Sequence, residues 1–165
     1  MTVTIRPLTA DDIPAVLDVQ RLCYRTELIE SAGSYSRKIA LFPDGCRAAV
    51  DRARLVGYVF AHPWMLGKEV PLDGSDYSLP ATFECMYFHD LAVHHAHRRS
   101  GAAGLLVAEL VAVASRSALN SFALVAVQES EAYWARWGFA ARRRMQYGAG
   151  VQATYMTCEG KPSWR

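Results

Sequence analysis

The segment best suited to chemistry is a short basic turn rich in small residues, and its members are Arg98, Arg99, Ser100, Gly101, Ala102, Ala103 and Gly104. The arginines carry fixed positive charge, and the small side chains let an anion approach the backbone closely. The start of a helix presents unpaired backbone N–H groups and a partial positive charge. The turn is therefore predicted to cradle a pyrophosphate group. The alternative is a helix start that simply packs closely on a strand.

Titratable side chains lie just before this turn, in the apolar run 83–93, and they are Glu84, Tyr87, His89 and Asp90. Histidine titrates near neutral pH, which suits a general base. Side chains alternate along a strand, so Tyr87 and His89 are expected on one face, with Glu84, Phe88 and Asp90 nearer the other. A β-bulge would break this alternation. The alternative for His89 is a side chain satisfied by loop backbone at a strand end.

Three elements must hold these residues in place. The run 83–93 is predicted to form a buried strand, and the apolar run 122–127 a central strand beside it. Between them, apolar residues recur at helical spacing from Gly101 to Leu119. One buried helix face is expected to contain Leu105, Leu106, Leu110, Val113 and Ala114. The basic turn therefore joins a strand directly to a helix start.

Two motifs carry a resemblance to a known family. The spacing Arg98-x-x-Gly101-x-Ala103 resembles the acyl-CoA loop of the GNAT superfamily of N-acetyltransferases, usually written Arg/Gln-x-x-Gly-x-Gly/Ala. Downstream, the segment 132–139 resembles the second signature of the superfamily, a short helix that ends in Gly-Phe. Both motifs lie in the order and spacing that the superfamily uses. The resemblance extends over the whole chain and implies acetyl-CoA as co-substrate.

The resemblance also implies roles for residues beside the turn. Leu91, Ala92 and Val93 would lend backbone groups to the pantetheine arm, and the N–H at Val93 or nearby would polarise the thioester oxygen. Ser130 falls near the place where a polar side chain often contacts the cofactor.

A closer resemblance concerns the strand itself. The run 89–94 resembles the matching strand of arylalkylamine N-acetyltransferases, which have a histidine at the position of His89 and another at that of Tyr87. There such residues serve the base through water, and the superfamily usually has a bulge in this strand. Asp90 is expected to orient His89 or to bind a cationic acceptor.

The second signature departs from the family pattern. The tyrosine that often donates a proton to the departing thiolate falls on Trp134, whose indole N–H cannot act as a general acid. Tyr133 is one residue earlier, about 100° round the helix. Either Tyr133 takes this role, or another tyrosine does, or the thiolate leaves unaided. The usual asparagine at the start of this signature is also missing, with Val127 or Gln128 in its place.

The remaining chain supplies the other elements of an α/β (α+β) fold. Strands are predicted at 2–6, 47–50, 55–61, 139–147 and 151–158, and helices follow the first strand from about residue 9 and near 25–35, with 36–42 ambiguous. The segment 62–82 is rich in proline and glycine and is predicted to be a loop that covers the acceptor site or an exposed hairpin extension. The resulting order implies one domain over residues 1–165, with a mixed, mostly antiparallel central sheet and helices on both faces.

Aromatic residues gather near the expected acceptor side, and they are Tyr58, Trp64, Tyr77, Tyr87 and Phe88. Core packing explains most of them. If several line the cleft, they favour an aromatic acceptor or a cation held by cation–π contact.

Composition limits the classes of partner. A formal charge of +2 without a long basic stretch argues against nucleic-acid binding. The N-terminus does not resemble a signal peptide, and no apolar run could span a bilayer. Scattered cysteines, at positions 23, 46, 85 and 158, indicate reduced thiols in a cytoplasmic protein. His94, His95 and His97 are expected to be exposed turn residues, and no metal is expected.

The sequence therefore predicts an N-acetyltransferase that moves an acetyl group from acetyl-CoA to a primary amine of a small molecule by direct attack in a ternary complex. The alternatives are acetylation of a protein lysine or N-terminus, and a non-catalytic acyl-CoA-binding module. Members of the superfamily often dimerise, and the sheet edge near the C-terminus could form a homodimer contact.

Overall fold

The computed structural model describes residues 2–74 and 76–164. Its strands are β1 (Val3–Pro7), β2 (Cys46–Asp51), β3 (Arg54–Trp64), β4 (Cys85–Val93), β5 (Ser121–Val127), β6 (Ala140–Tyr147) and β7 (Val151–Glu159). Its α-helices are α1 (Ile13–Cys23), α2 (Ala32–Leu41), α3 (Ala102–Arg116) and α4 (Glu131–Ala135). Short 3-10 turns lie at Ala10–Asp12, Thr26–Leu28, Pro43–Gly45 and His95–His97. The order of helices and strands agrees with the sequence prediction.

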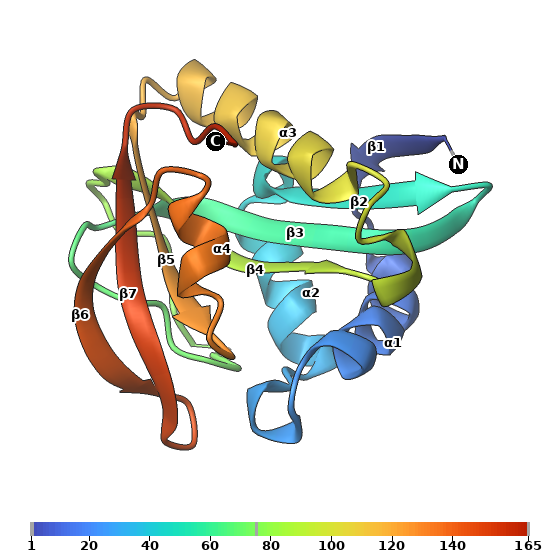
Figure 1. The fold of residues 1–165 in the computed structure, drawn as a ribbon, viewed down its shortest axis with the longest axis horizontal. Coiled ribbons are helices and arrows are strands. Elements are labelled where there is room, and N and C mark those ends of the chain that lie inside the picture. Colours follow the sequence, from blue (N-terminus) through green and yellow to red (C-terminus); the bar gives the residue numbers. More distant parts are fainter. Residues whose placement is uncertain (1, 75, 165) are drawn as a thin grey trace.

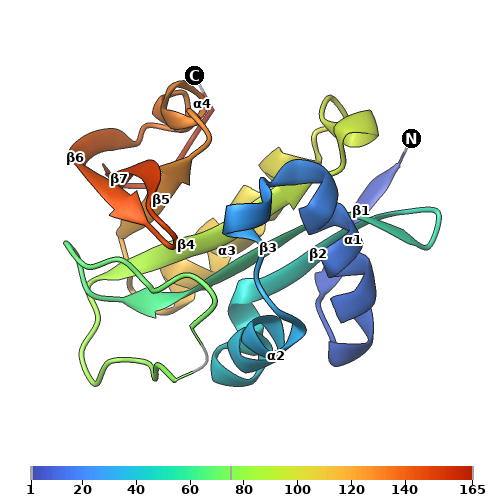
Figure 2. The same ribbon diagram turned by 90° about the horizontal axis from the view of Figure 1, so that it is seen from below.

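The strands form one seven-stranded sheet in the order β1-β2-β3-β4-β5-β7-β6. All neighbouring pairs are antiparallel except β4 and β5. Helix α3 covers one face of the sheet, and α1 and α2 cover the other (Figures 1 and 2). The predicted fold class, a mixed and mostly antiparallel sheet with helices on both faces, is confirmed.

Two apolar cores result from this layering. On one face, Leu106, Leu110 and Val113 of α3 pack with Phe88 and with apolar residues of β5. On the other face, apolar residues of α1 pack with Tyr58 of β3. None of the helices in the described part of the chain combines the length and apolar character needed to cross a bilayer.

Some predicted details are wrong, each for a local reason. Leu105 is 43% exposed, because the helix face centred on Leu106 turns its neighbour about 100° away from the sheet. Strand β3 runs on through Pro63 to Trp64, where the segment 62–64 was expected to be loop. Beyond Phe60, β3 pairs with β4 alone, and an edge of this kind tolerates proline.

Helix α2 also starts later than expected and includes most of the segment 36–42. The Ser31 hydroxyl accepts a hydrogen bond from the Ser34 N–H and so caps its start. Strand β4 begins at Cys85 rather than Phe83, whose side chain is exposed. The four cysteines are free thiols, as expected.

Candidate active site

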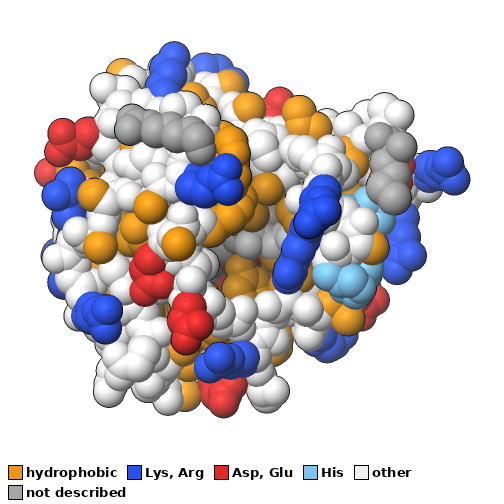
Figure 3. All heavy atoms as spheres, viewed as in Figure 1, with side chains coloured by type: hydrophobic (Ala, Val, Ile, Leu, Met, Phe, Trp, Pro, Cys, Tyr) orange, Lys and Arg blue, Asp and Glu red, His pale blue; other side chains and the backbone are white. Residues whose placement is uncertain are grey.

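The parallel strands β4 and β5 separate at their C-terminal ends and open a cleft there. They pair only where Met86–Phe88 lies beside Phe122–Leu124. The cleft beyond this point has a volume of about 440 Å³. The ends of both strands, the segment after α1, the start of α3 and helix α4 form its walls. Figure 3 shows a hollow with hydrophobic side chains in this face of the molecule, with basic side chains at its rim.

A β-bulge at His89 shapes the β4 side of the cleft. Asp90 lies opposite Phe60 and Phe88 lies opposite Ala61, so His89 is the extra residue. The alternation predicted from the sequence is therefore wrong beyond Phe88. The bulge turns Asp90 to the side of α1 and α2, and Tyr87, His89 and Asp90 all lie on the side opposite to Phe88.

Beyond the bulge, backbone groups of β4 point into the cleft. The His94 N–H donates to the Val56 carbonyl on β3, so by alternation Leu91 and Val93 direct their backbone away from β3. Their carbonyls accept from the Tyr24 hydroxyl (3.0 Å) and the Cys23 thiol (3.4 Å). Ala92 instead pairs with Tyr58 and packs beneath α1. Of the three residues expected to offer backbone groups, Leu91 and Val93 can do so.

The basic turn lies at one end of the cleft. Arg98 and Ala103 line it, and Gly101 directly precedes α3 with a left-handed φ of 83°. A Cβ added at Gly101 would meet open space, so an anion could approach the backbone there. Arg98, Gly101 and Ala103, which were expected to hold pyrophosphate, therefore fit that group.

The other residues of the turn position it. The Ser100 hydroxyl donates to the His97 carbonyl (2.7 Å), and Ala102 is buried beneath the helix. A Cβ added at Gly104 would lie 3.9 Å from the Trp137 ring. Arg99, which was expected to contact the cofactor, does not line the cleft.

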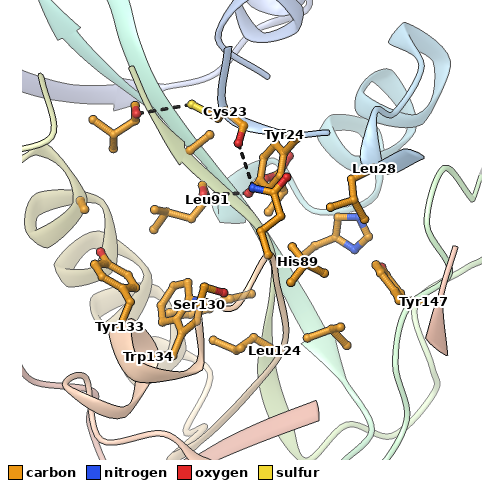
Figure 4. Close-up of a pocket in the computed structure, with 18 of the residues that line it drawn as sticks. Cys23, Tyr24, Leu28, His89, Leu91, Leu124, Ser130, Tyr133, Trp134 and Tyr147 are labelled. Carbon is orange, nitrogen blue, oxygen red and sulfur yellow. Dashed lines mark hydrogen bonds between the residues drawn. The ribbon is translucent and has the colours of Figure 1, made fainter. Parts of the chain in front are cut away.

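His89 pairs with a residue that the sequence analysis missed. Its Nε2 lies 2.9 Å from Oε1 of Glu30, and the two side chains are only 1% and 2% exposed. The Nδ1 atom is buried and has no hydrogen-bond partner among the described residues. Figure 4 shows the His89 ring next to Leu28 and Tyr147.

Glu30 is held ionised by the surrounding charges. Burial by itself raises the pKa of its carboxyl, but His89 and Lys38 outweigh this and hold the pKa well below its usual value. Its Oε2 accepts from the Lys38 ammonium (2.8 Å), the Ser34 hydroxyl (2.9 Å) and the Asp73 N–H (2.8 Å). Because an ionised carboxylate only accepts, Nε2 of His89 carries a hydrogen, and in the neutral form of the ring Nδ1 is then the free acceptor.

Asp90 accepts three hydrogen bonds from tyrosine hydroxyls: Tyr24 (2.7 Å), Tyr35 (2.7 Å) and Tyr58 (2.9 Å). Burial is the main reason that its pKa is raised. The observed bonds tie β4 to α1 and α2. None of these hydrogen bonds involves His89, the residue that Asp90 was expected to orient.

Tyr87 lies behind the cleft and does not line it. Its side chain is buried with Trp64 and Tyr155, and burial raises its pKa. The centres of the Tyr87 and His89 rings lie 6.2 Å apart, so Tyr87 packs beside the histidine. Of the aromatic residues expected near the acceptor, Phe88 alone lines the cleft.

Helix α4 and the residue before it form the opposite wall of the cleft. Ser130, Tyr133 and Trp134 line the cleft (Figure 4). Trp134 is buried against Phe88 (6.2 Å between ring centres) and Phe139 (5.5 Å), so it serves the core. Tyr133 is half-buried, and burial raises its pKa.

Gln128 bridges the mouth of the cleft. Its side-chain oxygen accepts from the Arg25 N–H (2.7 Å), and its amide donates to the Cys23 carbonyl (3.0 Å). These bonds join β5 to the end of α1. Neither Gln128 nor Glu30 has a sequence signal for its partner, because each contact joins distant segments.

Metal ligation has no support in the geometry. Within residues 2–74 and 76–164, no group of three or more His, Cys, Asp or Glu side chains could hold a metal ion. His94 and His95 stack on each other, and His97 lies 3.4 Å from Asp51.

Comparison with known families decides the family of this chain. The family model described as an acetyltransferase (GNAT) domain matches residues 78–160, which are 83 of the 165 residues. The chain belongs to the GNAT acetyltransferase family. The match includes β4, the basic turn, α3 and α4, which contribute residues to the lining of the cleft, and acetyltransferases of this family act with CoA-type substrates. A comparison with curated proteins gave no match.

Solved structures share the GNAT fold. Ard1 from Thermoplasma volcanium has 15% identity and a TM-score of 0.76, with 97% of this chain and 99% of that chain covered. The loading GNATL domain of CurA from Lyngbya majuscula has 9% identity and a TM-score of 0.80, with 96% and 98% covered. Naa20 from Chaetomium thermophilum, solved with a bisubstrate analogue, has 20% identity and a TM-score of 0.70, with 96% and 87% covered.

Proposed function

We propose that this GNAT domain transfers an acetyl group from acetyl-CoA to the primary amine of a small molecule, by direct attack in a ternary complex. The observation that carries the proposal is one continuous cleft. It runs from Arg98 and Ala103 near the start of α3, past Leu91 and Val93, whose backbone N–H groups point away from β3, to His89. One end suits a pyrophosphate and the other holds a base.

The amine must lose a proton to react, since the pKa of an alkylamine is about 10.4. The Nδ1 atom of His89 has a free lone pair and takes this proton directly or through one water. Glu30 holds the ring in the tautomer that leaves Nδ1 free. Glu30 is thus a positioning residue and His89 the base.

Acyl transfer from the thioester needs two further groups, one to stabilise the carbonyl oxygen and one to protonate the departing sulfur. The nitrogen forms a bond to the carbonyl carbon as the bond from carbon to sulfur breaks. The backbone N–H of Val93 stabilises the developing negative charge on the carbonyl oxygen. Tyr133, across the cleft from His89, gives its hydroxyl proton to the departing sulfur. Trp134 packs into the core and takes no part.

The size of the acceptor follows from the cover over the cleft. Leu72, from the loop 65–84, lines the cleft together with Leu28 and Tyr147. The same loop contributes Val70, whose carbonyl accepts from the Tyr147 hydroxyl (2.7 Å). This cover favours a small molecule over a polypeptide, for which a wide-open cleft would be expected.

The test is acetyl-CoA turnover by the purified chain against alkylamines, arylalkylamines, polyamines, amino acids, aminoglycosides and peptides, with products identified by mass. We expect a product from a small amine, and a His89→Ala variant with kcat reduced on the order of a hundredfold or more at unchanged acetyl-CoA affinity. A product from peptides alone would favour N-terminal or lysine acetylation. Acetyl-CoA binding without any product would favour a non-catalytic module.

A further inference from the structure

The acceptor end of the cleft is lined by apolar side chains from three distant segments. Leu28 comes from the 3-10 turn after α1, Leu72 from the loop 65–84, and Tyr147 from the end of β6. Leu28 and Tyr147 belong to one apolar cluster, and Leu72, Val125 and Val127 pack against it. Figure 4 shows Leu28 and Tyr147 on either side of the His89 ring.

Hydrogen bonds hold this end in place. The Asp73 carboxylate accepts from the Ser31 N–H and hydroxyl, both at 2.7 Å, and so ties the loop to the start of α2. Leu72 is also packed against Gly148, where an added Cβ would lie only 2.5 Å from its side chain. The shape of the acceptor end is therefore set before an acceptor binds.

The two carboxylates that line the cleft, Glu30 and Asp90, already accept hydrogen bonds from other residues of the chain. Glu30 accepts four hydrogen bonds, from His89, Lys38, Ser34 and the Asp73 N–H. Asp90 accepts three from tyrosine hydroxyls. A second ammonium group on an acceptor would lose its hydration in the cleft and find neither carboxylate free.

Acidic acceptors meet the same difficulty. The Lys38 ammonium, 2.8 Å from Glu30, is 1% exposed and bonded to Ser34 as well. Arg98, the basic residue in the cleft lining, lies at the pyrophosphate end beside Cys23. A carboxylate on the acceptor would therefore lie among Leu28, Leu72 and Tyr147.

We infer that the acceptor is a compact monoamine whose remaining part is an uncharged hydrocarbon, aliphatic or aromatic, and that Leu28, Leu72 and Tyr147 select it. The inference rests on the proposed acetyl transfer to small amines. It excludes diamines, polyamines, aminoglycosides and amino acids as preferred acceptors.

A matched pair of amines tests this selection. Pentylamine and 1,5-diaminopentane have the same carbon chain and differ by one ammonium group. We expect kcat/KM to be at least about tenfold higher for pentylamine than for the diamine. The reason is that burying an unpaired ammonium group in an apolar site costs at least the free energy that corresponds to a tenfold ratio. This comparison needs only the wild-type chain.

A charge-switch variant sharpens the test. Leu72→Glu places a carboxylate at the acceptor end and should shift the ratio toward the diamine by about tenfold or more. Leu66→Glu is the matched control, since Leu66 lies on the same loop and lines a second cavity instead. We expect it to keep the wild-type ratio.

The outcomes separate the two proposals. If a diamine, polyamine or amino acid is acetylated more efficiently than pentylamine, the inference is overturned and acetyl transfer to small amines stands. If no amine of any class is acetylated, the proposed function fails and the inference fails with it. If Leu72→Glu folds and leaves the ratio unchanged, Leu72 does not select the acceptor.

Discussion

Replacing Glu30 with glutamine separates the structural and chemical roles of the buried network. The carboxylate accepts hydrogen bonds from His89, Lys38, Ser34 and the Asp73 N–H. In Glu30→Gln, the neutral amide leaves the Lys38 ammonium buried without its counter-charge. Loss of one partner from a buried pair costs about 3–5 kcal/mol.

That cost is large for a domain of this size. Native stability is typically about 5–15 kcal/mol, and 1 kcal/mol shifts the Tm by about 2–4 °C in a domain of 150–250 residues. We therefore expect Glu30→Gln to lower the Tm by roughly 6–20 °C. Urea unfolding followed by circular dichroism measures the free energy of unfolding directly.

The effect of Glu30→Gln on the free energy of unfolding should depend on pH in a defined direction. The pKa of Glu30 in the folded chain is held below its unfolded value by His89 and Lys38. Its stabilisation is therefore present above the unfolded pKa, about 4.3, and is lost as the pH falls. The difference in unfolding free energy between wild type and variant should be largest near neutral pH and shrink in acid.

Activity distinguishes positioning from folding. At a temperature where both proteins are folded, we expect kcat of Glu30→Gln to fall on the order of a hundredfold with the acetyl-CoA KM unchanged, since His89 loses its orienting carboxylate. A double variant, Glu30→Leu with Lys38→Met, removes both charges and should regain much of the stability but not the rate. The reasoning fails if Glu30→Gln costs less than about 1 kcal/mol, as an exposed ion pair would, or if its turnover equals that of wild type.

Three further changes test other parts of the structure. Gly101→Glu should abolish acetyl-CoA binding in a folded chain, as measured by calorimetry. Gly101→Ala should retain measurable binding, because the site has room for a Cβ. Retained affinity in the glutamate variant would exclude pyrophosphate from this turn. Tyr133→Phe should lower kcat by about 10²-fold without changing the acetyl-CoA KM, and an unchanged kcat would mean that the thiolate leaves without its proton. Asp12→Asn should cost about 0.5–2 kcal/mol of unfolding free energy at pH 7, because Asp12 accepts from Arg6 and from the Thr9 N–H. The Arg6 hydrogen bond lowers the pKa of Asp12 to about 2, so urea unfolding should show this difference fading as the pH falls from about 4 toward that value.

The local sequence pattern predicts the helices, the strands and the basic turn. The basic turn at Arg98–Gly104, the helix after it and the order of strands follow from periodicity, charge and small residues near one another in the chain. Even there, Leu105 was misplaced, because periodicity alone does not say which side of an apolar helix faces the sheet. His89 was identifiable as a candidate base from its residue type and position on the strand.

The sequence by itself therefore determined the family and the fold class, and it predicted the turn that we propose for acetyl-CoA, since these depend on short motifs and regular spacing. The tertiary structure decided what surrounds them. Glu30 pairs with His89, which lies 59 positions later in the chain. The bulge at His89 turns Asp90 toward three tyrosines. Leu72 lines the cleft together with Leu28 and packs against the same apolar cluster. Contacts between distant segments leave no periodic signal, because each depends on how the sheet and its loops pack rather than on the neighbours of a residue in the chain.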